Sequence, residues 1–575
     1  MNYRWVFRES PDDSIIQQLT DQLRVPKSLA RVLASRGLHS ETDARGFFTP
    51  ELHALHDPFI MDGMEKAVSR IERAVKNKET IWIHGDYDVD GTSSTAMTLQ
   101  FLREIGASAQ YYIPDRMTEG YGLSEASINK ARSVDATLLI TVDCGITSNE
   151  VIDYANANGM EVLVCDHHEP GDTLPNAHAI LDPIKPGCPY PFKSLAACGV
   201  AFKLIQAICA NRGEPERAYA YLDYVAIASA ADIVPLIGEN RILVHYGLQL
   251  LNTFPRPGFK SLIDCANLDW GNLTTSSVIF GLAPRINAAG RIGDAKRAVE
   301  MMIQSDEVAA YHIAQELEQE NRKRRTLDEF TFDQAFRVAE KLLEGGKRRS
   351  LVLHSRDWHA GVIGIVASRL VEKYHLPTVM LTTVDGYAKG SARSIKEFDI
   401  HSALKQCEFL LHEFGGHKHA AGLSLPEENV DTLREMLDDV ARQQITDDML
   451  VPEILIDAPL PLNELSPTFF DKLKRFAPFG FSNHKPVFVT EGVVSANGVK
   501  IVGNNHLKFR ALQSNFIIDA IGFNLGNKMG IATSGKPFSV VYTLEENTYN
   551  GNTAPQLRIK DIKPDTDTTN VNGKL

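Results

Sequence analysis

The chain lacks a long hydrophobic run. Its 575 residues contain no stretch of about 18 consecutive apolar residues, and residues 1–10 have no apolar segment of the kind found in secretion signals. We therefore expect a soluble, cytoplasmic protein without a membrane contact.

Cysteine is scarce as well. The seven cysteines are odd in number and include no Cys-x-x-Cys pair. This pattern argues against a disulfide framework and fits a reducing compartment, where most of these side chains would be small buried hydrophobic groups.

Basic charge is also in deficit, because 60 lysines and arginines face 73 acidic residues and leave a net charge of −13. Net charge alone points away from nucleic acid, whose ligands usually show a basic footprint. Three local basic clusters remain, at residues 322–325, 347–349 and 472–475. Each is either a solvated helix face or loop or, if aligned with a binding site, part of a track for a strand.

Four segments carry side chains that commonly bind divalent metals. They are residues 84–91 (HGDYDVDG), 141–145 (TVDCG), 165–168 (CDHH) and 231–235 (ADIVP). Each follows a short apolar run that we interpret as a strand, at residues 80–83, 136–142, 161–164 and, less regularly, 225–228. Because an open α/β sheet binds its ligand at the carboxyl ends of the strands, we expect one pocket to hold all four segments.

The chemistry of these side chains points to metal-dependent hydrolysis. Closely spaced carboxylates repel one another unless cations neutralise them. Oxygen ligands mixed with imidazole suit Mn²⁺ or Mg²⁺ better than a structural zinc site, which favours thiolates. Two such ions roughly 3.5 to 4 Å apart are the common device for attack on a phosphodiester. The residues therefore predict a phosphoesterase.

The order of these residues resembles the DHH phosphoesterase superfamily. The pattern is His84-x-x-x-Asp88-x-Asp90, then Asp143, then Asp166-His167-His168, then Asp232. Further motifs are similar to those of the RecJ family of single-strand-specific exonucleases: residues 112–116 (YIPDR), 283–291 (APRINAAGR) and 415–422 (GGHKHAAG). The resemblance extends from about residue 6 to about residue 563.

The resemblance implies a set of site residues. Two Mn²⁺ or Mg²⁺ ions would be shared by six metal ligands, with Asp143 as a bridge: His84, Asp88, Asp90, Asp143, His167 and Asp232. The catalytic candidates are His168, Asp166 and Asp86. Asp86 would support a ligand such as His84, Asp166 would orient a histidine, and His168, in an extended segment, would point away from His167 and toward the scissile phosphate or leaving group. Substrate phosphates, including a terminal 5′-phosphate, would be bound by Arg116, Arg285, Arg291, Ser391, Arg393 and His417.

The expected fold class is α/β. Apolar strand runs that alternate with helices at residues 93–105 and 199–211 predict a parallel sheet. The DHH catalytic domain would be joined by a long helix to a smaller α/β DHHA1 domain, with a C-terminal β-barrel of the OB-fold type. The expected boundaries are residues 1–55 for an N-terminal helical segment, 56–304 for the DHH domain, 305–348 for the connecting helix, 349–447 for DHHA1, 452–564 for the nucleic-acid-binding barrel and 565–575 for a disordered tail.

Within the barrel, Phe509 and Arg510 are candidates for contact with bases or phosphates, although Phe509 is more readily explained as a core residue. The function implied by the resemblance is 5′→3′ exonuclease digestion of single-stranded DNA to 5′-mononucleotides, in DNA repair and recombination. The expected partners are a helicase and single-strand-binding protein, and the chain is expected to be a monomer.

Two alternatives stand beside this interpretation. The same superfamily contains hydrolases of small substrates, namely pyrophosphatases, cyclic-dinucleotide phosphodiesterases and short-oligonucleotide hydrolases, but these lack the barrel and the long basic connecting segment. A non-catalytic DNA-binding scaffold would have lost metal ligands, and every expected ligand is present here.

Overall fold

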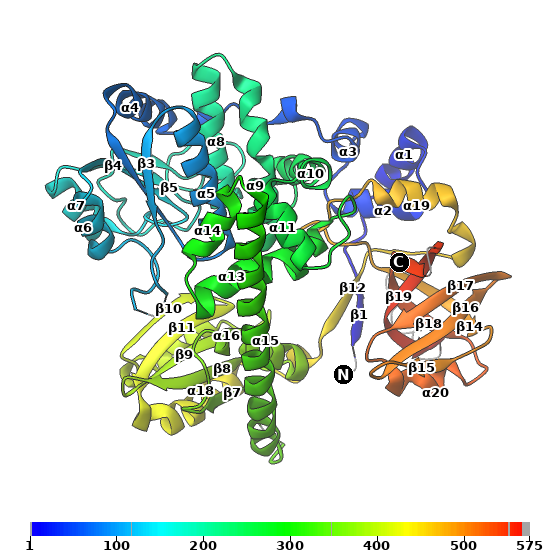
Figure 1. The fold of residues 1–575 in the computed structure, drawn as a ribbon. Helices are drawn as coiled ribbons and strands as arrows, with labels where there is room; N and C mark the ends of the chain where they lie inside the picture. Colours follow the sequence, from blue (N-terminus) through cyan, green and yellow to red (C-terminus); the bar gives the residue numbers. More distant parts are fainter. Residues whose placement is uncertain (1–2, 117, 347, 550–551, 566–575) are drawn as a thin grey trace. The chain divides into compact units, whose positions relative to one another are not determined.

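The computed structural model describes residues 3–116, 118–346, 348–549 and 552–565, which form two compact units (Figure 1). We call residues 55–450 the central unit, and residues 1–54 together with 451–575 the terminal unit. Lys347 of one basic cluster and residues 566–575 of the expected tail lie outside the described residues. Among the helices described, none combines the length and the apolar character needed to cross a bilayer.

The central unit begins with a parallel five-stranded sheet. Its strands are β2 (Thr80–Gly85), β3 (Ser108–Tyr112), β4 (Ala136–Val142), β5 (Glu161–Cys165) and β6 (Ala179–Leu181), in the order β3-β2-β4-β5-β6. The middle strands are nearly continuous apolar runs because both faces of the sheet are covered. The helices of this part are α4 (Met64–Asn77), α5 (Val89–Glu104), α6 (Glu125–Arg132) and α7 (Asn149–Ala157). The predicted parallel sheet is confirmed.

A helical region follows the sheet. It contains α8 (Ala197–Asn211), α9 (Leu222–Ala231), α10 (Gly238–Thr253), α11 (Pro257–Cys265), α13 (Ala283–Ile292) and α14 (Lys296–Ile303). The prediction of a strand at residues 225–228 is wrong, because these residues lie inside α9. Residues 222–230 are all buried, and an apolar segment without a polar face shows no periodicity that separates a buried helix from a strand.

A single helix of 37 residues, α15 (Glu307–Leu343), connects the two parts of the central unit. The carboxylate of Asp306 caps it by accepting a hydrogen bond from the backbone N–H of Ala309 at 2.8 Å. Its first half packs on α11, α13 and α14, and it also contacts β7 (Leu351–His354) and α16 (Ile363–Tyr374). The helix therefore ties both parts of the unit to one rigid element.

The second sheet has the order β10-β11-β9-β8-β7 and only its β7–β8 pair is parallel. The remaining strands are β8 (Thr378–Val384), β9 (Tyr387–Arg393), β10 (Glu413–His417) and β11 (Ala420–Pro426). With α16, the helices α17 (Ile400–Gln406) and α18 (Val430–Gln444) complete this smaller α/β part.

The terminal unit joins segments from both ends of the sequence. The strand β1 (Arg4–Phe7) pairs in parallel with β12 (Glu453–Ile456). The helices α1 (Asp13–Leu23), α2 (Lys27–Ser35) and α3 (Glu41–Phe48) share one hydrophobic core with α19 (Pro467–Lys474) and the barrel strands. Phe48 and Phe476, for example, lie in T-shaped contact with ring centroids 5.3 Å apart.

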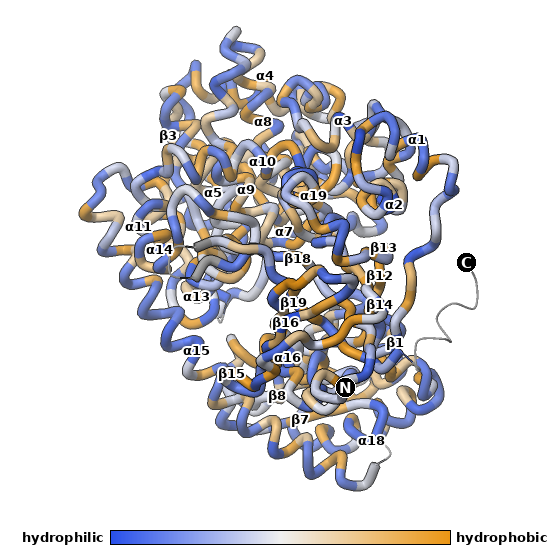
Figure 2. Tube along the Cα trace, turned by 90° about the vertical axis from the view of Figure 1, so that its right-hand side faces the viewer, coloured by the Kyte–Doolittle hydropathy of each residue, from blue (hydrophilic) through white to orange (hydrophobic). Residues whose placement is uncertain are grey.

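Five strands of the terminal unit close into a barrel. They are β14 (Phe488–Ser495), β16 (His506–Gln513), β17 (Phe516–Gly522), β18 (Phe538–Tyr549) and β19 (Asn552–Pro564), and the ring β14-β18-β19-β17-β16 closes through β14–β16 pairing. Figure 2 shows hydrophobic stretches along these strands. Phe509 is 1% exposed and belongs to the core, whereas Arg510 is exposed beside Asp519. The predicted barrel is confirmed, and of the two side chains only Arg510 can face a ligand.

Candidate active site

Three aspartates fall within five residues, in the turn after β2 and the first turn of α5. Oδ1 of Asp88 caps α5 by accepting hydrogen bonds from the backbone N–H groups of Asp90 at 2.9 Å and Gly91 at 3.1 Å. A Cβ atom at Gly91 would lie 2.5 Å from the carbonyl oxygen of Asp86, so only glycine permits this close approach. The glycine therefore allows a turn tight enough to keep the carboxylates together.

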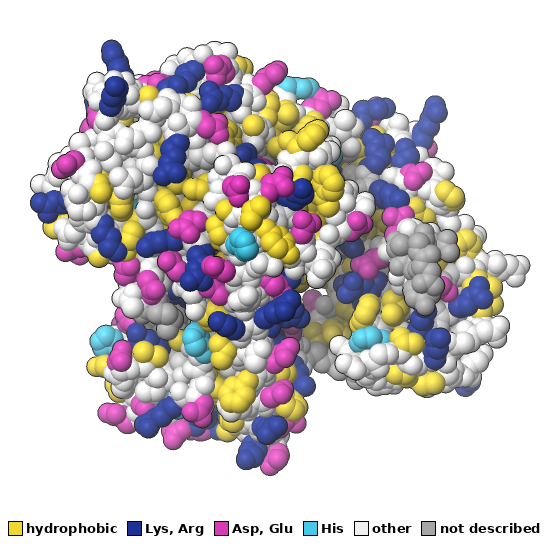
Figure 3. Space-filling model, viewed as in Figure 1, with side chains coloured by type: hydrophobic (Ala, Val, Ile, Leu, Met, Phe, Trp, Pro, Cys, Tyr) yellow, Lys and Arg dark blue, Asp and Glu magenta, His cyan; other side chains and the backbone are white. Residues whose placement is uncertain are grey.

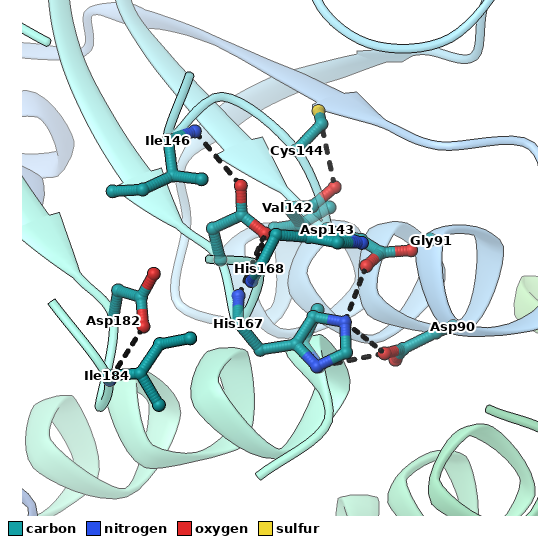
Figure 4. Close-up of polar contacts among 12 residues, drawn as sticks. Asp90, Gly91, Val142, Asp143, Cys144, Ile146, His167, His168, Asp182 and Ile184 are labelled. Atoms are coloured by element: carbon teal, nitrogen blue, oxygen red, sulfur yellow. Dashed lines mark hydrogen bonds and ion pairs between the residues drawn. The ribbon is translucent and has the colours of Figure 1, made fainter. Parts of the chain in front are cut away.

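Potential ligand atoms from the four segments meet in three groups, and within each group they lie within 4.8 Å of one another. The groups are Asp86 with Asp88 and Asp143, Asp90 with His167 and Asp232, and Asp143 with His167 and His168. Asp143 and His167 each belong to two groups, so the three form one constellation, part of which is drawn in Figure 4. Nε2 of His167 lies 3.3 Å from Oδ1 of Asp143 and 3.7 Å from Oδ2 of Asp232.

The aspartates of the constellation lie at the ends of strands and helices. Asp143 follows β4 with φ 64°, a left-handed conformation that aspartate adopts more readily than most residues. Asp232 is the C-terminal cap of α9. Asp90 lies in the first turn of α5, and its carboxylate accepts hydrogen bonds from the backbone N–H groups of Ala197 and Cys198 at 2.8 Å each. These N–H groups open α8, whose positive end favours a negative charge.

The constellation concentrates negative charge in a buried place. Burial is the main reason that the pKa values of Asp86, Asp90 and Asp143 are raised, and neighbouring carboxylates raise them further. Burial and the charge of Asp90 likewise raise the pKa of Asp232 to about 8.

Two buried atoms of the three ligand groups, Nε2 of His167 and Oδ1 of Asp86, have no hydrogen-bond partner within the part of the chain that the structure describes. Divalent cations would neutralise the carboxylates and occupy such free coordinating atoms. The donor set of carboxylate oxygens with imidazole therefore fits Mn²⁺ or Mg²⁺.

His84 is not brought into any of these groups, and Asp86 stands there instead. Nδ1 of His84 lies 2.7 Å from Oγ of Ser127, and Nε2 lies 3.2 Å from the carbonyl oxygen of Gly122. Trp82 also reaches Oγ of Ser127, because residues two apart in a strand share one face. Burial lowers the pKa of His84 to about 4, so this ring is a neutral buried group on the face covered by α6.

His168 lies next to His167, with ring centroids 4.5 Å apart, and shares a ligand group with it and Asp143. The expectation that the two rings point to opposite sides is wrong, because β5 ends at Cys165 and the chain is no longer extended at this point. Oδ1 of Asp166 lies 2.7 Å from Nδ1 of His168. Burial opposes ionisation of both groups, but this contact lowers the pKa of Asp166 and raises that of His168 to about 9.

Two residues at the site were missed by sequence reasoning. The hydroxyl of Tyr121 lies 3.2 Å from the carbonyl oxygen of Asp143 and 3.4 Å from the ring nitrogens of His168, and it sits in a loop without periodicity. Asp182 follows β6 as the other acids follow their strands, so the same rule would have found it. Its Oδ1 accepts the N–H of Ile184 at 2.9 Å, and burial raises its pKa to about 7.

Three of the predicted phosphate-binding arginines gather beside this site. Burial lowers the pKa of Arg291 to about 10, and the charges of Arg116 and Arg393 lower it further while Asp88 opposes them. Burial and Arg116 also lower the pKa of Arg393. The guanidinium of Arg116 lies over the ring of Tyr87 at 5.1 Å. Arginines that destabilise one another's charge form a site that an anion would stabilise.

Ser391 belongs to the same place, since Nη1 of Arg393 donates to its Oγ at 2.8 Å. The first turn of α16 packs closely here, because a Cβ atom at Gly364 would lie 2.9 Å from that Oγ. Arg285 and His417 are placed differently. Nε of Arg285 forms an ion pair with Glu318 at 2.7 Å, and His417 is an exposed residue at the end of β10.

The face of the molecule in Figure 3 shows acidic and basic side chains interspersed over the central unit. In this unit the first basic cluster is also partly neutralised, since Arg322 pairs with Glu318 at 2.7 Å.

Comparison with known proteins matches three parts of the chain to known families. Residues 80–229 match the DHH family, N-terminal domain, residues 348–443 the DHHA1 domain, and residues 456–561 the RecJ OB domain. The single-stranded-DNA-specific exonuclease RecJ of Bacillus subtilis is 37% identical over 97% of this chain and 70% of its own length. RecJ of Escherichia coli is 33% identical over 94% of this chain and 96% of its own length.

Solved structures agree with this. RecJ from Thermus thermophilus in complex with Mn²⁺ superposes with a TM-score of 0.83 at 29% identity, covering 97% of this chain and 79% of that one. An exonuclease RecJ bound to manganese gives a TM-score of 0.59 at 33% identity, covering 69% of this chain and 97% of that one. Domain order, full-length identity and fold coincide, and the chain belongs to the RecJ family of single-stranded-DNA-specific exonucleases.

Proposed function

We propose that this chain is a 5′→3′ exonuclease that hydrolyses single-stranded DNA to 5′-mononucleotides with two divalent ions, Mn²⁺ or Mg²⁺. The observation that carries the proposal is the linked constellation of ligand groups beside a cluster of mutually repelling arginines. The first part suits attack on a phosphodiester, and the second suits a terminal phosphate.

The ligand groups suggest how the ions are shared. Asp86, Asp88 and Asp143 would hold one ion, and Asp90, His167 and Asp232 the other. Asp143 is near both sets, since its Oδ1 lies 3.3 Å from Nε2 of His167, and it would be the bridge. Bound ions would stabilise charge on the phosphoryl oxygens and make a water molecule more acidic. His84 takes a supporting role in this assignment, behind the turn that presents Asp86.

His168 would contact the substrate directly. Its Nδ1 is held by the buried carboxylate of Asp166, which leaves Nε2 as the atom available to a substrate oxygen. The contact with Asp166 also favours the protonated imidazole, because it raises the pKa of His168 to about 9, whereas divalent ions bound nearby would act in the opposite direction. A charged imidazole in this place would donate a hydrogen bond to the scissile phosphate or to the leaving oxygen.

The arginine cluster would determine the strand end from which digestion starts. Arg116, Arg291, Arg393 and Ser391 would bind a terminal 5′-phosphate one nucleotide away from the scissile bond. Such a pocket favours a chain end over the interior of a strand, which would explain removal of single nucleotides. Arg285 is not part of this pocket because it already pairs with Glu318, and His417 is not because it is exposed on a separate strand.

We infer that the barrel of the terminal unit adds contacts to the single strand, as a family match to the RecJ OB domain supports. In cells, this activity would serve DNA repair and recombination, after a helicase has supplied unwound strand and with single-strand-binding protein as a partner. A monomer would suffice, because one chain holds both the ligand constellation and the arginine cluster.

The test is Mn²⁺-dependent digestion of a 5′-labelled and a 3′-labelled oligonucleotide of about thirty nucleotides, with a duplex of the same sequence as the control. Immediate release of labelled mononucleotide from the 5′-labelled strand alone, with the duplex spared, would establish both activity and polarity. Inert oligonucleotides combined with hydrolysis of dinucleotides or pyrophosphate would move the chain to the small-substrate branch of its superfamily.

A further inference from the structure

Ile233 is an exposed β-branched residue in a backbone conformation that such residues rarely adopt. Its φ is 60° and its side chain is 60% exposed. It directly follows Asp232, the cap of α9, at the position where a helix commonly ends in a left-handed residue and where glycine is usual. For a β-branched side chain this conformation is a genuine outlier.

The surrounding loop fixes this conformation. Val234 and Leu236 are buried on one side of the loop, while Ile233 and Ile237 alternate with them on the exposed side. The buried Asn240 holds the loop, because its Nδ2 donates to the carbonyl oxygen of Pro235 at 3.1 Å. The fold therefore directs the side chain of Ile233 outward.

Folding alone does not account for isoleucine here. A side chain that is 60% exposed gains little from the hydrophobic effect, and glycine would make the same turn without strain. Strained residues that persist beside a site are a sound starting point for a hypothesis of function. What isoleucine adds to the turn is an apolar surface.

Ile233 is the next residue in the chain after a member of the ligand constellation. Asp232, the preceding residue, offers its carboxylate to the group it forms with Asp90 and His167. A DNA strand presents the apolar face of a base beside each phosphate. An apolar protein surface next to the scissile phosphate would meet such a face, and the contact would tolerate every base because no hydrogen bond is read.

We propose that Ile233 is a substrate-positioning residue whose side chain forms an apolar ledge for the base next to the scissile phosphate. The inference rests on the proposed exonuclease function and adds a contact to it. The strained turn aims the ledge, and the ledge holds the nucleotide in register with the ligands of the site.

The first test replaces the residue with glycine and compares it with a matched control. Lys78 also has a left-handed backbone, with φ 56°, at the end of α4, where the chain enters the amino-terminal end of β2 away from the site. Both Ile233→Gly and Lys78→Gly should raise the Tm by about 1 to 3 °C through relief of strain. Only Ile233→Gly should raise KM for a single-stranded oligonucleotide, by about 5- to 20-fold, with a smaller change in kcat.

The second test asks whether the lost contact is to a base. Oligonucleotides that lack the base on either side of the first scissile bond are compared with the intact strand, for wild type and Ile233→Gly, as a double-mutant cycle. Removal of the base should raise KM of the wild type several-fold, and it should leave KM of the Ile233→Gly variant almost unchanged. Ile233→Asn, which keeps a residue tolerant of the left-handed region, should behave like the glycine variant.

The outcomes separate the two proposals. A wild type that does not digest the intact strand would refute the exonuclease function itself. An active wild type with an equally active Ile233→Gly variant would show that the turn only aims Asp232, and would overturn the ledge. If removal of the base raised KM equally for wild type and Ile233→Gly, the proposed contact between Ile233 and a base would be refuted.

Discussion

Oδ1 of Asp166 lies 2.7 Å from Nδ1 of His168 and accepts the backbone N–H of His167 at 2.8 Å. The other oxygen, Oδ2, accepts the backbone N–H of Ile146 at 3.0 Å. One buried carboxylate thus connects the segment after β4 to the paired histidines after β5. Asp166 holds the ring of His168 and the backbone of His167 without belonging to any of the three ligand groups.

Asp166→Asn should lower kcat by about 10- to 100-fold, because losing the partner of a site histidine typically has an effect of this size. KM for the oligonucleotide should change much less. The control is Asp438→Asn, which removes the charge of a buried acid in the smaller α/β part, where its Oδ1 accepts the backbone N–H groups of Arg349 at 2.7 Å and Ser350 at 3.0 Å. Steady-state kinetics on a 5′-phosphorylated strand measure both variants, and a fully active Asp166→Asn variant would remove its orienting role.

Asp86 and His84 provide a direct comparison of a ligand with a supporting residue. Asp86→Asn should reduce activity by more than about 100-fold and weaken the activation by Mn²⁺ added back after chelation, since one ligand group loses a charged oxygen. His84→Gln should mainly lower the Tm, because a buried ring loses its contact with Ser127. If the His84 variant shifted the Mn²⁺ dependence as strongly as the Asp86 variant, the two assignments would have to be exchanged.

The sequence predicted the strands of the first sheet well, and the reason is physical. β4 coincides with the predicted run at residues 136–142, because a strand buried on both faces is apolar throughout and is bounded by polar residues. The run at residues 225–228 is equally apolar but belongs to α9, so composition alone did not distinguish the two. Asp232 nevertheless reaches the site, because it is the residue that caps the end of α9. The end of a helix can place a side chain at the site just as the end of a strand can.

The side-chain directions were harder to predict than the positions. His84 and Asp86 are two residues apart, and the family pattern favours the histidine, yet the turn after β2 presents the aspartate. The direction of the His168 side chain depends on whether the chain stays extended beyond Cys165. No local sequence pattern predicts this. Arg116, Arg291 and Arg393 come from three distant segments, namely the loop after β3, the helix α13 and the strand β9, and only the folded chain reveals that they repel one another.

Arg393→Ala should reduce the preference for 5′-phosphorylated over 5′-hydroxyl ends, by about 10-fold or more, because a charge-assisted contact to the terminal phosphate is lost. Arg285→Ala is the matched control. It removes an arginine paired with Glu318 and should affect stability more than end preference. Competition between the two labelled ends in one reaction measures the ratio directly, and an unchanged ratio in Arg393→Ala would separate this residue from the end-binding pocket.

The last prediction concerns stability in acid. The guanidinium of Arg70 is buried, and its nitrogens lie 2.7 Å from Oε2 of Glu79 and 2.6 Å from Oε2 of Glu161. Burial opposes ionisation of both carboxylates, but hydrogen bonds, from Thr137 and Arg70 to Glu79 and from Arg73 and Arg70 to Glu161, lower both pKa values below 4.5. Groups with a lowered folded pKa stabilise the protein above their unfolded pKa, and this contribution is lost as pH falls through the folded pKa.

Glu79→Gln should therefore lower the Tm at pH 7, and its Tm should differ progressively less from that of the wild type below about pH 4.5. Glu72→Gln, which breaks the surface pair with Arg212, should show a smaller effect at pH 7, and a Glu79→Gln deficit that persisted in acid would contradict the prediction.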